Sequence, residues 1–167
     1  MKRNVPFFIS YWLPIVITAG IIFIASSQPY HEQDLRPSLS ERFDLEFIEV
    51  AFQDVEFTYS DSVVSISTRG VDGFVEFFIR KGAHFGVFFI LGFFCYRLFR
   101  AYSTPQWKSI FYSLVFVIVY ASLDEFHQSL TPNRTPLVAD VILDTIGGIV
   151  GITIAYLIYR RRTLVKT

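Results

Sequence analysis

Residues 122–151, SLDEFHQSLTPNRTPLVADVILDTIGGIVG, place charged side chains between two long apolar segments. The polar residues at the facing ends of those segments include Asp124, Glu125, His127, Gln128, Arg134, Asp140 and Asp144. An ionised side chain at the centre of a bilayer costs about 2.5–3.5 kcal/mol on insertion scales. A chain that carries this stretch must therefore pair these groups with one another, hydrate them or use them for a function.

The composition of the whole chain predicts a small integral membrane protein. Of its 167 residues, 52% are hydrophobic and 19 are phenylalanine, and the mean hydropathy is +0.43. Fifteen Lys and Arg residues balance fifteen Asp and Glu residues without forming a basic stripe, so we expect no nucleic-acid partner. The single cysteine, Cys95, lies in an apolar run and excludes an intrachain disulfide.

Four apolar segments are long enough to cross a bilayer, which takes about 20 residues of helix. We expect these spans at about 7–26, 76–98, 107–125 and 137–159. They predict an all-α integral membrane protein, a bundle of four transmembrane helices in a single domain over residues 1–167, with the lipid bilayer as its surroundings. A cleaved signal peptide is the alternative for the first segment. Its apolar part is longer than the usual stretch of about 7–15 residues, so we favour an uncleaved anchor.

The positive residues near the span ends predict that both termini are cytoplasmic. With this orientation nine of the fifteen basic residues lie inside: Lys2, Arg3, Arg97, Arg100, Lys108, Arg160, Arg161, Arg162 and Lys166. No acidic residue falls on that side, because eleven lie between Glu32 and Glu76 and the other four belong to 122–151. We therefore expect a multi-pass protein of the plasma membrane with its carboxylates outside or in the outer half of the bundle.

The segment 28–73 is the one sizeable part between spans, and we expect it to be extracytoplasmic. Apolar residues at helical spacing over 33–52 predict short helices that rest on the membrane surface. The runs 56–59 and 63–67 flank Ser60-Asp61-Ser62 and predict a β-hairpin. Gly70 and Gly73 are expected to break the chain before the second span. We favour a spacer that caps the helices over a lid that gates a substrate.

In an up-and-down bundle, the start of the second span, the end of the third and the start of the fourth meet at one membrane face. We expect one polar cluster there, formed by Lys81, His84, Asp124, Glu125, Gln128, Arg134, Asp140 and Asp144. Lys81 and Arg134 would hold a phosphate or carboxylate, and the acids would orient these cations and accept ligand hydroxyls. The alternative is that ion pairs, Lys81 with Glu125 and Arg134 with Asp140, only fix the helix register.

Metal binding and catalysis are weaker hypotheses for the same cluster. His84, His127 and the four acids are suitable ligand types for Zn²⁺ or Mg²⁺, but no HExxH or comparable spacing occurs, so we expect no metal and no other cofactor. Glu125 and His84 are the candidates for acid–base catalysis. No GxSxG motif is present, and we interpret His127 as an interfacial hydrogen-bonding residue rather than a general base.

Two GxxxG pairs have a packing meaning, because small residues at this spacing let helices approach closely. They are Gly147 with Gly151 on the fourth span, and Gly82 with Gly86 on the second. We expect packing within the chain rather than dimerisation, and the oligomeric state stays open.

The segment KGAHFGVFFILGFF at 81–94 and the stretch 122–151 resemble the VanZ family of small bacterial membrane proteins, as does SSQP at 26–29. The resemblance is strongest over 80–151. Carried over residue by residue, the family's characteristic positions fall on Lys81, His84, Phe85, Asp124, Glu125, Gln128, Arg134, Asp140, Asp144 and Gly147. The chain departs from the pattern at Asp144, where an asparagine is expected, and at Asn133, where a glycine often precedes the arginine. The first departure adds a negative charge to the cluster.

The family takes its name from a teicoplanin-resistance determinant, so the resemblance implies a role at the cell envelope of a bacterium. The family's biochemical activity is not established. We expect a protein that binds an anionic lipid-linked or cell-wall ligand at the polar cluster, with a link to glycopeptide susceptibility. The alternatives are an enzyme that modifies an envelope precursor, a small proton-coupled transporter with His84 and the carboxylates as a relay, and a purely structural partner protein.

Overall fold

The computed structural model describes residues 6–132 and 134–164, with side chains up to Arg160. Its long helices are α1 (Leu13–Ser27), α4 (Ile66–Ala101), α5 (Gln106–Ser129) and α6 (Val138–Leu164), and a π-helical turn, η1 (Phe8–Trp12), precedes α1. The predicted cytoplasmic residues Lys2, Arg3 and Lys166 lie outside the described residues, as does Asn133. The side chains of Arg161 and Arg162 are also not described.

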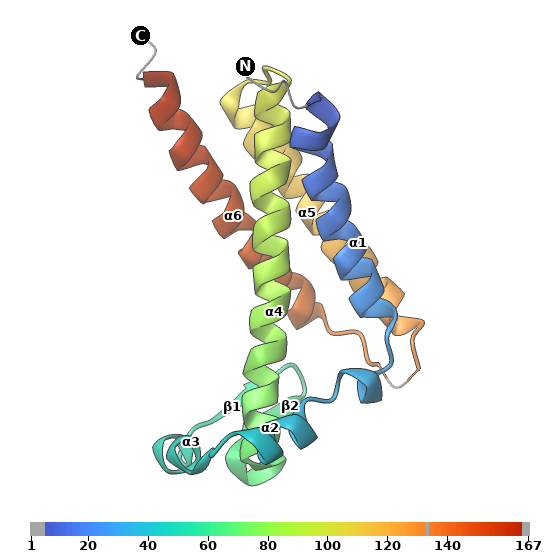
Figure 1. Ribbon diagram of the computed structural model, residues 1–167, viewed down its shortest axis with the longest axis vertical. Coiled ribbons are helices and arrows are strands. Elements are labelled where there is room, and N and C mark those ends of the chain that lie inside the picture. The colour runs from blue at the N-terminus through green and yellow to red at the C-terminus, as the bar shows by residue number, and fades with distance from the viewer. Residues whose placement is uncertain (1–5, 133, 165–167) are drawn as a thin grey trace.

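The four long helices form a bundle in which α4 is the central element (Figure 1). It packs most extensively against α6 and also contacts α5 and α1. The start of α1 and the end of α6 lie at the same end of the bundle, as a four-span chain requires. Which side of the membrane this end faces remains a prediction.

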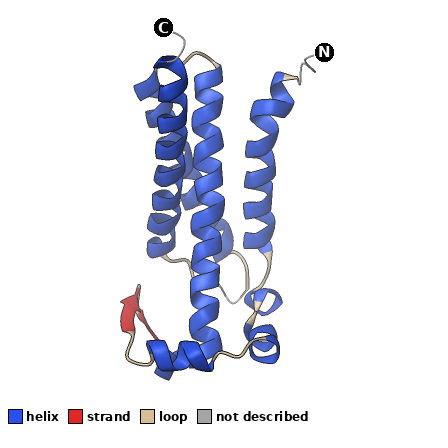
Figure 2. Cartoon of the chain, turned by 60° about the vertical axis from the view of Figure 1, so that its left-hand side comes forward, coloured by secondary structure: helices blue, strands red, loops and turns tan. Residues whose placement is uncertain are grey.

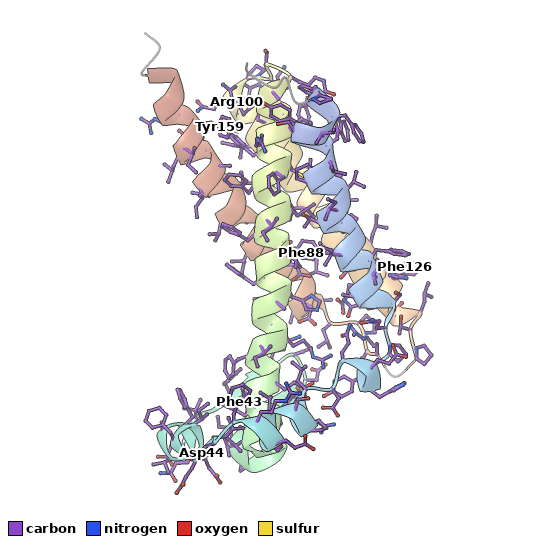
Figure 3. The ribbon with its side chains drawn as sticks, viewed as in Figure 1. Phe43, Asp44, Phe88, Arg100, Phe126 and Tyr159 are labelled. Carbon is purple, nitrogen blue, oxygen red and sulfur yellow. The ribbon has the colours of Figure 1, made fainter. Side chains whose placement is uncertain are left out.

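The core of the bundle is apolar and aromatic. Phe88, Leu91 and Tyr96 of α4 are fully buried, together with Val117 of α5 and Ala155 of α6. Phe88 lies in the middle of the bundle in Figure 3. This core is small for the number of apolar residues, because many of them lie on the outside of the helices.

Those outward apolar side chains identify the bundle as a membrane domain. On α1, Ile17, Phe23 and Ile24 are each more than half exposed, and on α5 Phe126 is 64% exposed (Figure 3). Among the described residues, four helices are long and apolar enough to span a bilayer: Phe8–Ser27, Ile66–Ala101, Gln106–Ser129 and Val138–Arg160. The prediction of an all-α membrane protein with four transmembrane helices is confirmed.

Glycines bring α6 into direct contact with α4. A Cβ added at Gly147 would meet the carbonyl oxygen of Phe85, and one at Gly151 would meet that of Phe89. This GxxxG pair therefore packs within the chain, as expected. The pair on α4 is different, because a Cβ at Gly82 or Gly86 would meet nothing within 4 Å. The prediction that this second pair packs inside the bundle is wrong.

A small outer cap lies beyond the end of the bundle where α1 and α5 end and α6 begins (Figure 2). Its elements are η2 (Tyr30–Gln33), α2 (Arg36–Arg42), α3 (Glu46–Phe52), β1 (Glu56–Tyr59) and β2 (Ser62–Ser65). The two strands pair antiparallel from Glu56 with Ser65 to Tyr59 with Ser62, which confirms the predicted hairpin.

The short helices predicted within 33–52 are present as α2 and α3. The chain leaves helical geometry at Phe43, which is extended, and this residue separates the two helices. Leu39 is buried on α2, whereas Phe47 and Val50 on α3 are 80% and 65% exposed. The apolar spacing continues across this break, so periodicity does not show where one helix ends and the next begins.

α4 begins ten residues earlier than the span predicted at 76–98. Ser65 caps it by accepting a hydrogen bond from the backbone N–H of Thr68, in a capping box. Of the two glycines expected to break the chain, Gly70 has a φ of +72° and interrupts the helix, whereas Gly73 is helical. The helix thus continues outward from the bundle and carries the cap at its end.

Candidate functional site

The predicted polar cluster forms at the end of the bundle that carries the cap, where side chains from α1, α4, α5 and α6 meet. The first contact joins α4 to α6: the Lys81 ammonium lies 2.6 and 2.7 Å from the two carboxylate oxygens of Asp140. The hydroxyl of Tyr59, from the hairpin, donates to the same carboxylate at 2.5 Å. Burial and this hydrogen bond raise the pKa of Tyr59 above its ordinary value. Asp140 is therefore held by the outer cap as well as by α4.

The ion pairs predicted from the sequence are wrong in their partners. Lys81 pairs with Asp140 and not with Glu125, and Arg134 donates to the side-chain oxygens of Gln128 and Gln33 rather than to Asp140. The reason is the register of α6, because the first turn of this helix brings Asp140 opposite Lys81 on α4. Burial among these neighbours lowers the pKa of Arg134.

Glu125 connects α5 to the start of α6. Its Oε1 accepts a hydrogen bond from the backbone N–H of Leu137, which immediately precedes α6. Its Oε2 is buried and has no hydrogen-bond partner among the described residues. An unpartnered buried oxygen is uncommon in proteins and leaves this carboxylate with capacity for a further contact.

Asp124 connects α5 to α1. Its Oδ1 accepts from the Ser26 hydroxyl at 2.6 Å, and its Oδ2 accepts from Gln128 Nε2 at 3.0 Å. Thr131 then donates to the carbonyl oxygen of Ser26 at 3.1 Å. Ser26 is only 2% exposed and was not identified from the sequence, although it stands at the polar end of the first span.

His84 and Asp144 face each other across the contact between α4 and α6. His84 Nδ1 lies 3.5 Å from Asp144 Oδ2, and Asp144 is 1% exposed. Asp144 Oδ1 has no hydrogen-bond partner among the described residues. The eight predicted binding residues thus lie in one region, but they form separate contacts around it rather than one network of ion pairs.

A second group of charges, missed by sequence reasoning, lies just outside this cluster. Glu76 is 3% exposed and accepts from Arg80 at 2.7 Å and from the Tyr30 hydroxyl at 3.1 Å. The Arg80 guanidinium lies over the Tyr30 ring, 4.4 Å from its centroid. Arg36 Nε is 3.7 Å from Glu76. The spacing of Glu76 and Arg80, four residues apart on a helix, was a signal that could have revealed the pair.

Arg36 also anchors the start of α2 to the preceding loop. Its guanidinium lies 2.6 Å from Asp34, and this pairing lowers the pKa of Asp34 to about 2. Two carboxylates therefore accompany Arg36 and Arg80. Among the described residues Arg69 has no carboxylate within 4 Å, and it donates instead to the Ser62 hydroxyl and lies over the Phe77 ring.

Two cavities adjoin these charges. The outer cavity, of about 340 Å³, has four cations in its wall and one carboxylate. These are Arg36, Arg69, Arg80, Lys81 and Glu76. The side cavity, of about 310 Å³, lies between α1 and α4 and is mostly apolar, with Ile21, Ile22, Ile79 and Val87 among its lining residues. Arg80 belongs to both linings.

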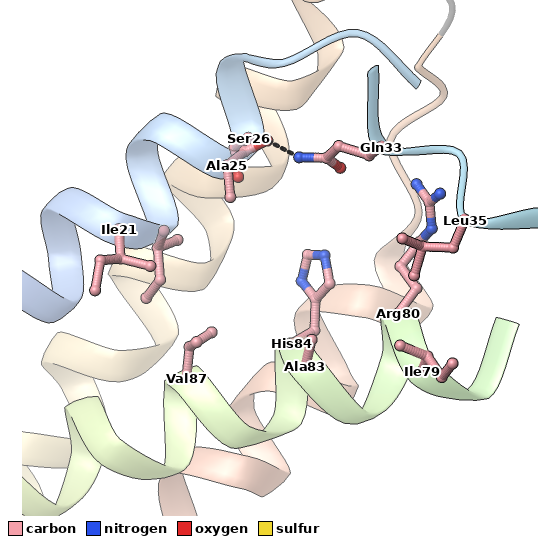
Figure 4. A pocket seen from close by; sticks show the side chains of 11 residues that line it. Ile21, Ala25, Ser26, Gln33, Leu35, Ile79, Arg80, Ala83, His84 and Val87 are labelled. Carbon is pink, nitrogen blue, oxygen red and sulfur yellow. Dashed lines mark hydrogen bonds between the residues drawn. The ribbon is translucent and has the colours of Figure 1, made fainter. Parts of the chain in front are cut away.

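The side cavity ends at polar groups of the cluster (Figure 4). His84 extends from α4 into the space between the helices, with Ser26 and Gln33 across from it. Gln33 Nε2 donates to the carbonyl oxygen of Ala25 at 2.7 Å and so connects the cap to the end of α1. An apolar chain in this cavity would meet hydrogen-bonding groups at one end.

Comparison with known proteins identifies the family of the chain. A search of curated proteins and a search of solved structures each found no match. A model of the VanZ/LLP1 family matches residues 9–159, which include the cap, every residue of the polar cluster and all four spans except their end residues Phe8 and Arg160. The chain therefore belongs to the VanZ/LLP1 family, as its resemblance at 81–94 and 122–151 predicted.

Proposed function

We propose that this membrane protein binds an anionic amphiphile of the outer leaflet, such as a lipid-linked envelope precursor. The observation that carries the proposal is the pair of adjoining cavities that share Arg80, one cationic and one apolar. An amphiphile has the same two parts, and its anionic head would occupy the outer cavity while its chain occupied the side cavity. This placement agrees with the predicted orientation, in which the cap is extracytoplasmic.

The charges of the outer cavity favour an anion. Four cations and one carboxylate give its lining a formal charge of three positive units, and Asp34 and Asp140 behind the lining reduce this excess to one. Arginine suits a phosphate because its planar group donates two parallel hydrogen bonds. Arg69 is the cation most available to bind an anion, because no carboxylate among the described residues lies within 4 Å of it.

The sequence assigned anion binding to Lys81 and Arg134, and we revise that assignment. Both side chains are already engaged, Lys81 by Asp140 and Arg134 by two glutamine oxygens. We therefore propose Arg69 and Arg80 as the residues that contact the head group. Lys81 adds positive charge to the wall, and Arg134 positions the loop before α6. We advance binding rather than catalysis or transport because the cavity pair supports it directly.

Spin-labelled phosphatidylglycerol and phosphatidylcholine with the same acyl chains test the proposal on the full chain in detergent. The immobilised fraction should be larger for phosphatidylglycerol. Loss of one charge-assisted hydrogen bond costs about 1.5–3 kcal/mol, so Arg69→Gln should weaken binding of this lipid about tenfold or more. Arg42→Gln is the matched control, because Arg42 is an exposed cation of the cap that lines neither cavity.

The chain-binding half of the proposal has its own test. Ala83→Phe should narrow the side cavity and reduce immobilisation of both lipids, whereas Ile90→Phe, on the same helix but outside the lining, should not. Equal binding of the two lipids by all variants would contradict the proposal. Competition by millimolar inorganic phosphate, with no lipid preference, would identify a soluble anion as the ligand instead.

A link to teicoplanin is part of the proposal and derives from the family. Expression of the chain in a susceptible host should raise the teicoplanin concentration that stops growth, and Arg69→Gln should reverse the increase while Arg42→Gln preserves it. Four variants test the polar site as a whole: Lys81→Ala, Glu125→Gln, Arg134→Ala and Arg69→Gln. If all of them accumulate in the membrane and keep the full teicoplanin phenotype, the polar site has no part in that phenotype.

A further inference from the structure

The polar cluster contains three potential metal ligands that come from three different helices. One imidazole nitrogen of His84 on α4 and one carboxylate oxygen each of Asp124 on α5 and Asp144 on α6 all lie within 4.8 Å of one another. No sequence motif could show this group, because its members are separated by 40 and 20 residues and meet only in the folded bundle.

Among the described residues, the two carboxylates of this group are buried with no Lys or Arg side chain within 4 Å. Asp124 is 5% exposed and accepts hydrogen bonds only from the neutral Ser26 and Gln128 side chains among the described residues. Asp144 is 1% exposed, has His84 as its neighbour at 3.5 Å, and keeps Oδ1 unpartnered. A buried charge is stable only when it is paired or coordinates a metal.

The nearby cations Lys81 and Arg134 do not neutralise these two carboxylates, because each is bound to other side chains. The Lys81 ammonium lies on both oxygens of Asp140, one turn before Asp144 on α6. Arg134 donates to Gln128 and Gln33, outside the group. Two carboxylates and one imidazole therefore converge with a formal charge of two negative units, which a divalent cation neutralises.

We propose that His84, Asp124 and Asp144 bind a divalent transition-metal cation, for which Zn²⁺ is the probe. Imidazole nitrogen with carboxylate oxygens is a donor set that Zn²⁺ accepts, and three protein ligands leave a fourth position open. The bonds from Ser26 and Gln128 fix the Asp124 carboxylate as outer hydrogen bonds commonly fix metal ligands.

The proposed metal site lies next to the side cavity. His84 and Ser26 both line the side cavity between α1 and α4, so a cation held at the group borders that cavity (Figure 4). His127 does not share this environment: it stacks on Phe23 with ring centroids 4.3 Å apart. Of the chain's three histidines, His84 is the one in the metal-binding group.

Equilibrium dialysis of the tag-free, chelator-treated full chain against Zn²⁺ tests the proposal without any added lipid. Mass-spectrometric metal analysis should find one Zn²⁺ per chain. His84→Gln and Asp144→Asn should each weaken Zn²⁺ binding at least tenfold. The controls are His127→Gln, which removes a histidine outside the group, and Asp54→Asn, which removes an exposed carboxylate of the cap. Both should keep one Zn²⁺ per chain.

Binding of less than 0.2 Zn²⁺ per wild-type chain, or equal binding by His84→Gln and His127→Gln, would overturn the proposal. If the site variants do not fold, metal binding by the wild-type protein alone tests the proposal. Loaded with Co²⁺ in place of Zn²⁺, it should give a visible absorption band that one equivalent of Zn²⁺ abolishes, and absence of that band would equally reject the site. Because no lipid is present, either result leaves the amphiphile proposal to its own test.

Discussion

Lys81 on α4 and Asp140 on α6 form a two-pronged ion pair, with the ammonium 2.6 and 2.7 Å from the two carboxylate oxygens. Their side chains are 15% and 9% exposed, so the pair is shielded from water on most sides. Removing one partner of a buried pair leaves an uncompensated charge and typically costs about 3–5 kcal/mol, whereas replacing both with apolar groups is often neutral.

The first prediction concerns this ion pair. Lys81→Met and Asp140→Leu should each lower the thermal unfolding midpoint in detergent, and the double variant should recover most of the loss. Tryptophan fluorescence during heating measures the midpoints, and a double-mutant cycle gives the coupling. Additive losses in the double variant would show that the two side chains act independently.

The close approach of α6 to α4 gives the second prediction. A Cβ at Gly151 would overlap the Phe89 carbonyl oxygen, so Gly151→Ala should destabilise the bundle by about 1–3 kcal/mol through overpacking. Gly86→Ala is the matched control: nothing lies within 4 Å of its added Cβ, and alanine favours a helix by up to about 1 kcal/mol. Thermal unfolding of the two variants should therefore shift in opposite directions or, for Gly86→Ala, not at all.

Ser26 and Ser27 provide a third prediction, because the two neighbours differ in what they bind. Ser26 is buried and donates to Asp124 on α5, whereas Ser27 is exposed and donates to Ile24 in its own helix. Ser26→Ala leaves a carboxylate oxygen without its donor and should cost about 1–3 kcal/mol. Ser27→Ala should be nearly neutral. Equal unfolding midpoints for the two variants would mean that the contact between α1 and α5 does not depend on this bond.

Tyr59 provides a prediction about pH. Its pKa is raised by burial and by the hydrogen bond to Asp140, so the protonated hydroxyl is favoured in the folded state. The stability it contributes is fully present below its unfolded pKa of about 10 and is lost as the pH rises through the higher folded value. Absorbance at 295 nm should show Tyr59 ionising above the exposed tyrosines, and Tyr59→Phe should remove that late component. If Tyr59→Phe instead removes a component that titrates at the ordinary tyrosine pKa of about 10, the hydrogen bond from Tyr59 to Asp140 would be contradicted.

The fold could largely be predicted because a helix exposed to lipid is apolar on all sides and so appears in the sequence as a simple pattern. Outward residues such as Phe126 and inward residues such as Phe88 are both apolar, so each span is one continuous apolar run. The hairpin was also local, set by Ser60 and Asp61 between two short runs of strand-forming residues. Neither inference required knowledge of how the helices cross.

The partners of the charged residues did require that knowledge. Lys81 meets Asp140 because of the relative register of α4 and α6, which Gly147 and Gly151 fix by contact with the Phe85 and Phe89 carbonyl groups. The sequence placed Lys81 and Asp140 in one cluster but could not rank their neighbours. It also missed the pair of Glu76 and Arg80, although both lie in the predicted span 76–98 and share a helical face.

α4 passes without a break in helical geometry from the turn after Gly70, through the walls of both cavities, to the far end of the bundle. At about 1.5 Å per residue, the 31 residues from Val71 to Ala101 form a rod of about 46 Å, of which a bilayer core covers about 30 Å. The outer cap is thus attached to the end of a long, continuous helix. Arg69 and the hairpin lie beyond the Gly70 break at the end of this rod. We therefore expect a tilt of α4 in the membrane to move the cap, and occupancy of the side cavity to change the position of the cap.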